Sequence, residues 1–108
     1  MKGRHLTPAL LVAVAGRFKV LSEPARLEVL NALRAGPLHV SGLMEATGLS
    51  QANLSKHLRV LHAEGLVSRR REGLFVFYEI SDRSVMRLCD LVCGAVETRA
   101  RRTVLAFR

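Results

Sequence analysis

Residues 49–71 read LSQANLSKHLRVLHAEGLVSRRR, and this stretch decides the fold. Ser50 is a favourable N-cap, leucines then recur at helical spacing, and Gly65 is a common helix terminator, so we predict a helix over residues 51–64. A two-residue link that contains a glycine separates it from a short helix predicted over residues 40–47. Two short helices around a tight turn of this kind are typical of a helix-turn-helix.

The residues that follow predict a β-hairpin. Residues 66–71 and 74–80 are rich in β-branched and aromatic side chains, and Glu72-Gly73 between them is a hairpin turn signal. Three consecutive arginines make the first of these strands basic. A helix-turn-helix followed directly by a basic hairpin indicates a winged helix.

Three further helices are predicted around this unit. Pro8 suits the first turn of a helix, where its missing N–H is not needed. Ser22 can cap a second helix that ends before Gly36, and Asp82 can cap a last helix that ends near Arg99.

The expected fold class is therefore mainly α with a β-hairpin wing, in the order helix, helix, helix, helix, strand, strand, helix. We expect three parts along the chain: a flexible N-terminal arm (1–7), a winged helix-turn-helix DNA-binding and dimerisation domain (8–99), and a basic C-terminal tail (100–108).

The first and last helices carry more apolar surface than one chain can cover. The first is apolar nearly all round, and the last leaves only a narrow polar strip beside a wide apolar surface formed by Val85, Met86, Leu88, Cys89, Leu91, Val92, Cys93 and Val96. Such surfaces mark contacts with a partner. We predict a homodimer that joins through these two helices.

The charge balance indicates a polyanionic partner. The chain of 108 residues has 17 Lys and Arg against 9 Asp and Glu, a formal net charge of +8. No stretch approaches the length of a membrane span, the apolar run Leu10–Val12 is too short for a signal peptide, and no helix has the form of a basic membrane-surface helix. We expect a soluble, unexported, cytoplasmic protein that binds nucleic acid and no membrane.

The helix over residues 51–64 carries suitable DNA-reading side chains opposite its leucines. Gln can pair with an adenine edge, Lys and Arg with guanine or phosphate, and Ser with several bases, while alanine allows close approach. Any surface helix is polar outside, but the tight turn, the arginine run and the net charge favour DNA here. The predicted DNA-binding residues are Gln51, Ala52, Asn53, Ser55, Lys56 and Arg59 on the helix, with Arg70 and Arg71 on the wing.

Residues 18–82 resemble the ArsR/SmtB family of winged-helix repressors. The resemblance is carried by Leu21-Ser22-Glu23-Pro24-Ala25-Arg26-Leu27, by Leu49-Ser50-Gln51 through Ser55-Lys56-His57-Leu58, and by Glu64-Gly65-Leu66-Val67 before the arginines. It implies a homodimeric transcriptional repressor that leaves its operator when an inducer binds. It also implies that Gln51, Ser55 and Lys56 read DNA with support from Arg59, Arg70 and Arg71, whereas His57 is expected to pack. Two-fold symmetry then predicts double-stranded operator DNA with an inverted repeat.

The sequence departs from both familiar inducer sites of that family. His39 and Ser41 stand where a third-helix thiolate pair is expected, and Ser84, Ala95 and Thr98 stand where the last-helix zinc pattern needs ligands. What remains is the pair Cys89 and Cys93, four residues apart on the last helix.

The two thiols fit a bridging ligand better than a direct disulfide. Their Cβ atoms should lie about 5 to 6 Å apart, whereas a disulfide needs about 3.8 Å. We predict that Cys89 and Cys93 sense a soft metal or metalloid ion (arsenite, cadmium or copper(I)) or a reactive sulfur species or oxidant. Arsenite prefers three sulfurs, so the twin chain or a solvent ligand would have to complete its site.

Two alternatives stay open at this point. The cysteines could act only as small buried hydrophobes in a repressor with no metal or thiol switch. A thiol oxidoreductase is disfavoured because the pair lacks the CxxC form, and the sequence has no phosphate loop, metal-bound water site or nucleophile–base pair. We therefore expect no enzyme.

Overall fold

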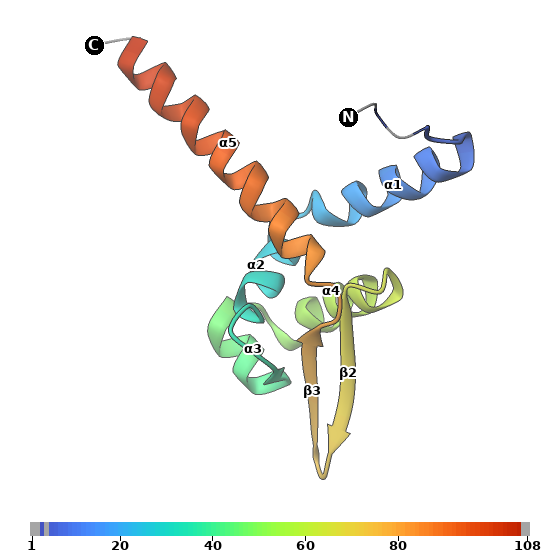
Figure 1. The fold of residues 1–108 in the computed structure, drawn as a ribbon. Helices are drawn as coiled ribbons and strands as arrows, with labels where there is room; N and C mark the ends of the chain where they lie inside the picture. Colours follow the sequence, from blue (N-terminus) through green and yellow to red (C-terminus); the bar gives the residue numbers. More distant parts are fainter. Residues whose placement is uncertain (1–2, 4, 107–108) are drawn as a thin grey trace.

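The computed structural model describes residue 3 and residues 5–106, and it confirms the predicted order of helices and hairpin strands (Figure 1). Residues 1, 2 and 4 of the expected arm and 107 and 108 of the expected tail lie outside the described residues. The elements are α1 (Pro8–Leu21), α2 (Pro24–Ala32), β1 (Leu38–His39), α3 (Val40–Thr47), α4 (Gln51–Ala63), β2 (Val67–Glu72), β3 (Phe75–Ile80) and α5 (Ser84–Ala106). The short strand β1 is the one element that the sequence did not predict.

The core lies where α2, α3 and α4 meet the base of the hairpin. Leucines dominate it: α4 turns a stripe of leucines inward, and α2 and α3 each bury a leucine against that stripe. The largest fully buried side chains are Leu30, Leu33, Leu43, Leu54, Leu61, Leu66 and Val29. The first turn of α5 closes this core with Val85 and Met86.

The wing is a three-stranded antiparallel sheet in the order β1-β3-β2. The pairing of Glu72 with Phe75 leaves Gly73 and Leu74 as the turn, one residue later than predicted. Gly73 has φ +62°, whereas no described residue other than glycine has a positive φ. A glycine in this conformation before a residue of negative φ corresponds to a type II′ hairpin turn.

Three helix ends differ from the predictions. Ser22 does not cap α2: it still belongs to the last turn of α1, where its hydroxyl donates to the carbonyl of Lys19 at 2.7 Å, and Glu23 precedes α2 without a side-chain cap. Thr7, which was assigned to the flexible arm, is the N-cap of α1: its Oγ1 accepts from the backbone N–H of Leu10. α5 extends to Ala106, so the predicted boundary between residues 99 and 100 falls inside a helix.

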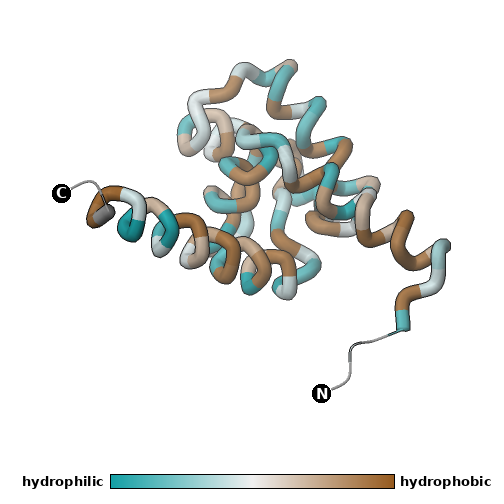
Figure 2. The backbone as a smooth tube through the Cα atoms, turned by 90° about the horizontal axis from the view of Figure 1, so that it is seen from above, coloured by the Kyte–Doolittle hydropathy of each residue, from teal (hydrophilic) through white to brown (hydrophobic). Residues whose placement is uncertain are grey.

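α1 and α5 project from the body on the side away from the hairpin (Figure 1). Only Leu21 of α1 is buried, and Figure 2 shows hydrophobic bands along both helices where they leave the body. The exposed large apolar residues there are Leu11, Val12, Val14 and Phe18 on α1 and Leu91, Val92, Val96, Val104 and Leu105 on α5. Within the described part of the chain, no helix is both long and apolar enough to cross a membrane.

Candidate nucleic-acid interface

α4 divides into a buried face and an exposed polar face, as predicted. Its N-terminus is fixed by Ser50, whose Oγ accepts from the N–H of Asn53 at 3.2 Å, and α3 ends at Gly48 with φ +73°, which permits the tight link between the two helices. The buried residues are Leu54, His57, Leu58 and Leu61. All six predicted reading residues are exposed: Gln51, Ala52, Asn53, Ser55, Lys56 and Arg59.

His57 packs inside the protein. It is only 7% exposed, and its Nδ1 accepts from the Nε of Arg26 on α2 at 3.4 Å. Burial lowers the pKa of His57, and the neighbouring charges of Arg26 and Lys56 lower it further. A neutral imidazole at this point holds α4 against α2 and leaves the exposed face free.

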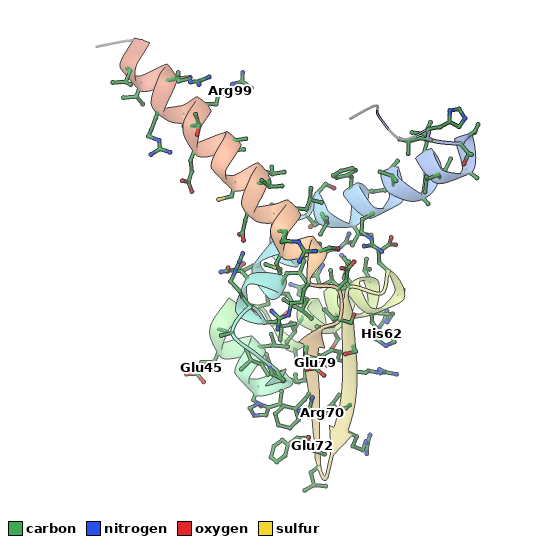
Figure 3. The ribbon with its side chains drawn as sticks, viewed as in Figure 1. Glu45, His62, Arg70, Glu72, Glu79 and Arg99 are labelled. Atoms are coloured by element: carbon green, nitrogen blue, oxygen red, sulfur yellow. The ribbon has the colours of Figure 1, made fainter. Side chains whose placement is uncertain are left out.

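The two predicted wing arginines lie on opposite faces of the hairpin, because successive residues of a strand alternate. Arg70 is paired with Glu72 at 2.8 Å and Glu79 at 3.1 Å, and its guanidinium carbon lies 5.6 Å from the ring centre of Phe77 (Figure 3). Its charge is therefore offset within the wing. Arg71 is exposed on the other face.

Arg69 is a basic residue that the sequence analysis left out. It shares the face of Arg71, since both lie an even number of residues from Val67 on β2. Both side chains are exposed, and the described residues include no carboxylate within ion-pair distance of either. Because side chains alternate between the two faces of a strand, the sequence could have shown that Arg69 and Arg71 share one face.

An ion-pair junction connects α4 with the two projecting helices. Arg17 of α1 donates to Asp82 Oδ2 at 2.9 Å, to Glu64 Oε1 at 3.2 Å and to the carbonyl of Glu64 at 3.3 Å. Glu64 is the C-cap of α4, and Asp82 Oδ1 accepts from the N–H of Ser84 at the start of α5. The pKa of Asp82 is lowered, first by its hydrogen bond from the Ser84 hydroxyl and further by Arg17. No local motif predicts this junction, because its members lie 47 and 65 residues apart.

Cys89 and Cys93 line a groove of about 460 Å³ between α1, α2 and α5. Cys89 is half-buried and Cys93 is exposed. Beside them, Arg34 at the end of α2 forms two hydrogen bonds with Asp90, at 3.0 and 3.2 Å. The groove joins the helix that carries the thiols to the helix that supports α4.

Both thiols are protonated at neutral pH in this arrangement. Burial raises the pKa of Cys89, although the charge of Arg34 opposes this shift. The pKa of Cys93 is raised mainly by its hydrogen bond to Glu97 Oε1, which the thiol donates at 3.3 Å. Among the described residues, no three His, Cys, Asp or Glu side chains gather closely enough to hold a metal ion.

The fold defines the class of the protein: a winged helix-turn-helix with an exposed polar fourth helix and an arginine-bearing wing. Residues 23–69 match the family model described as "Bacterial regulatory protein, arsR family". The chain belongs to the ArsR family of bacterial regulatory proteins.

Curated and solved relatives agree with this assignment. The regulator NmtR of Mycobacterium tuberculosis is 43% identical over 77 residues, which are 71% of this chain and 64% of NmtR. The activator HlyU of Vibrio cholerae is 36% identical over 68% of each chain. The homodimeric winged helix-turn-helix domain Mb0332 of Mycobacterium bovis superposes with a TM-score of 0.78 at 33% identity, over 94% of this chain and 95% of that domain. The match therefore spans less than two thirds of the length of NmtR.

Proposed function

We propose that this protein is a homodimeric transcriptional repressor that binds an inverted-repeat operator through α4 and the wing of each copy. The observation that carries the proposal is the exposed face of α4, where Gln51, Ser55 and Lys56 stand on a helix whose other face is buried. This helix has the width and chemistry that the major groove accepts, and the net charge of +8 supplies attraction to phosphate.

The dimer is supported by the apolar residues on the two projecting helices. Val12 on α1 is 73% exposed and Leu91 on α5 is 75% exposed in the single chain. Burying large side chains of this kind contributes about 1.5 to 3 kcal/mol each, so a second copy is the occupant that the surface favours. Mb0332, a structural relative, is described as homodimeric.

Selection of bound sites from a random duplex library tests this function. We expect enriched sequences with two-fold symmetry and half-sites about one helical turn apart. The variants Gln51→Ala and Lys56→Ala should lose about 1 to 3 kcal/mol of discrimination at one position of each half-site, whereas Asn31→Ala, an exposed polar control on α2, should not. Failure to enrich any symmetric sequence would refute the proposal.

We also propose that Cys89 and Cys93 form the inducer site and that a soft ion or a reactive sulfur species bridges them. Support comes from their place in one groove between α2 and α5, because a ligand bound there can shift α1 and α5 relative to α4. Such coupling between two sites is usually about 1 to 3 kcal/mol. With two thiols per chain, cadmium, copper(I) and polysulfide suit the pair, while arsenite would need a third ligand, either a sulfur of the partner copy or a solvent ligand.

Titration of the operator complex with cadmium, copper(I), arsenite and polysulfide tests the inducer site. We expect at least one of them to release the wild-type protein and none to release the double variant Cys89→Ser, Cys93→Ser, which should still bind the operator. If the double variant responds as the wild type does, the cysteines only pack.

A further inference from the structure

The tip of the wing carries a large apolar side chain with nothing to pack against. Leu74 is 97% exposed, and Phe75 beside it is 54% exposed. Leu74 occupies the second position of the two-residue turn, which in a type II′ turn has a negative φ and places no demand on the side chain. Neither the turn nor the core uses this leucine, so its side chain is available for an external contact.

The charges around the tip select the chemistry of that contact. Arg69 and Arg71 lead to the turn along one face, while on the other face Arg70 pairs with both Glu72 and Glu79, so the three arginines outnumber the two carboxylates. The region next to Leu74 therefore keeps an excess of positive charge, which complements phosphate. A second identical tip would be repelled, and a bilayer contact would need a wider apolar face than one turn provides.

The wing is also braced against bending. The His39 ring of β1 lies edge-on to Phe75 at 5.4 Å, and Phe77 lies 5.6 Å from the same histidine and also beneath Arg70. β1 pairs with β3, the central strand of the sheet, and runs directly into α3, so it ties the hairpin to that helix. The hairpin projects beyond the helices (Figure 1), and these contacts keep its tip in position when it is pressed against a binding partner.

We propose that Leu74 is a minor-groove wedge: it enters the groove that flanks the α4 contact, partly unstacks a base step and bends the operator. Arg69 and Arg71 hold the phosphates on either side of it. Leucine is one of the apolar side chains suited to insertion between base steps, and groove-lining arginines stabilise the narrowed backbone. This inference rests on the proposed DNA binding and adds a deformation of the duplex to it.

The test uses a duplex chosen by selection with the wild-type protein, with 2-aminopurine placed at each flanking step and a dye pair at the two ends. Wild-type protein should raise the 2-aminopurine fluorescence at one step on each side and shorten the distance between the ends. Leu74→Ser should abolish both signals while its affinity changes less than about tenfold, because the lost contact and the saved unstacking offset each other. Leu6→Ser, at an exposed leucine that lies outside both the dimer helices and the wing, should behave as the wild type.

Two other outcomes would refute the proposed insertion of Leu74 between base steps. Wild-type protein that binds the duplex without either signal, or a Leu74→Ser variant that keeps both, shows that the tip does not enter the stack. A change in the oligomeric state of free Leu74→Ser protein in sedimentation assigns the tip to a protein contact instead. Absence of wild-type binding to any duplex would refute the proposed function, which the affinity measurement detects separately.

Discussion

Arg17 on α1 donates to Asp82 Oδ2 at the start of α5 over 2.9 Å, although 65 residues separate them in the chain. The same guanidinium holds the side chain and the carbonyl of Glu64 at the end of α4. One side chain thus connects both projecting helices to the C-terminus of α4. If inducer binding moves α1 or α5, we expect this junction to transmit the movement to α4.

Replacing Arg17 tests the junction. Arg17→Gln removes the charge and leaves two carboxylates and a helix-end carbonyl without their donor. Because the partners are about one third exposed, we expect the free energy of unfolding to fall by only about 1 kcal/mol. The coupling free energy between inducer binding and operator binding should fall by more than the free energy of unfolding does. Chemical denaturation and operator titration measure the two effects, and Lys19→Gln on the same helix is the control; unchanged coupling in Arg17→Gln would contradict the assigned role.

The two predicted wing arginines should differ in their response to salt. Arg71 is exposed on the face it shares with Arg69, whereas Arg70 is engaged by Glu72 and Glu79. A phosphate contact contributes about 1 to the slope of log affinity against log salt. We expect Arg71→Ala to reduce the slope by about that amount and Arg70→Ala to reduce it less. Equal slopes for the two variants would show that the ion pairs of Arg70 open on DNA.

His57 should make stability depend on pH. Its folded pKa lies below the usual 6.5, because it is buried and faces Arg26 and Lys56, with Glu23 the only nearby acid acting in the other direction. As the pH falls, His57 is therefore protonated in the unfolded chain before it is protonated in the folded protein. Its contribution to the free energy of unfolding is present above pH 6.5 and is lost as the pH falls through the folded pKa. Denaturation from pH 7.5 downward should show this loss. The His57→Gln variant should lose less stability over this pH range than the wild type. The control His62→Gln, on the exposed face of α4, should lose as much as the wild type. If His57→Gln still shows the full loss, His57 is not its source.

Cadmium binding to the thiols should strengthen with rising pH. Both cysteine pKa values are raised, so the metal must displace protons from Cys89 and Cys93 as it binds. We expect each bound ion to release up to two protons, and the Cys93→Ser variant to release fewer. A pH series of cadmium titrations followed by thiolate absorbance measures this, and affinity that is constant between pH 6 and 8 would argue against thiolate ligation.

The sequence predicted the local elements well because each is marked by residues close together in the chain. In α4, Ser50 determines where the helix starts, its leucines determine which face is buried, and Gly65 determines where it stops. The hairpin turn was misplaced by one residue, since Glu72-Gly73 and Gly73-Leu74 both offer a glycine and only the pairing of β2 with β3 distinguishes them. That one residue is what places Leu74 at the tip.

The site was predicted less completely than the fold. The exposed face of α4 follows from helical periodicity, and the exposure of its six residues agrees with it. The partners of Arg17, the carboxylates around Arg70 and the Arg34–Asp90 contact beside the thiols depend on distant segments that only the folded chain brings together. Local patterns carry no information about such pairs.

Sedimentation of the protein, alone and with a selected inverted-repeat duplex, tests the central claim most directly. Two copies joined through α1 and α5 should sediment as a dimer when free and should bind with two chains to each duplex, with no intermediate that holds a single chain. A free species that remains a single chain at high concentration, and that loads one chain at a time onto duplexes with or without the repeat, would contradict the account.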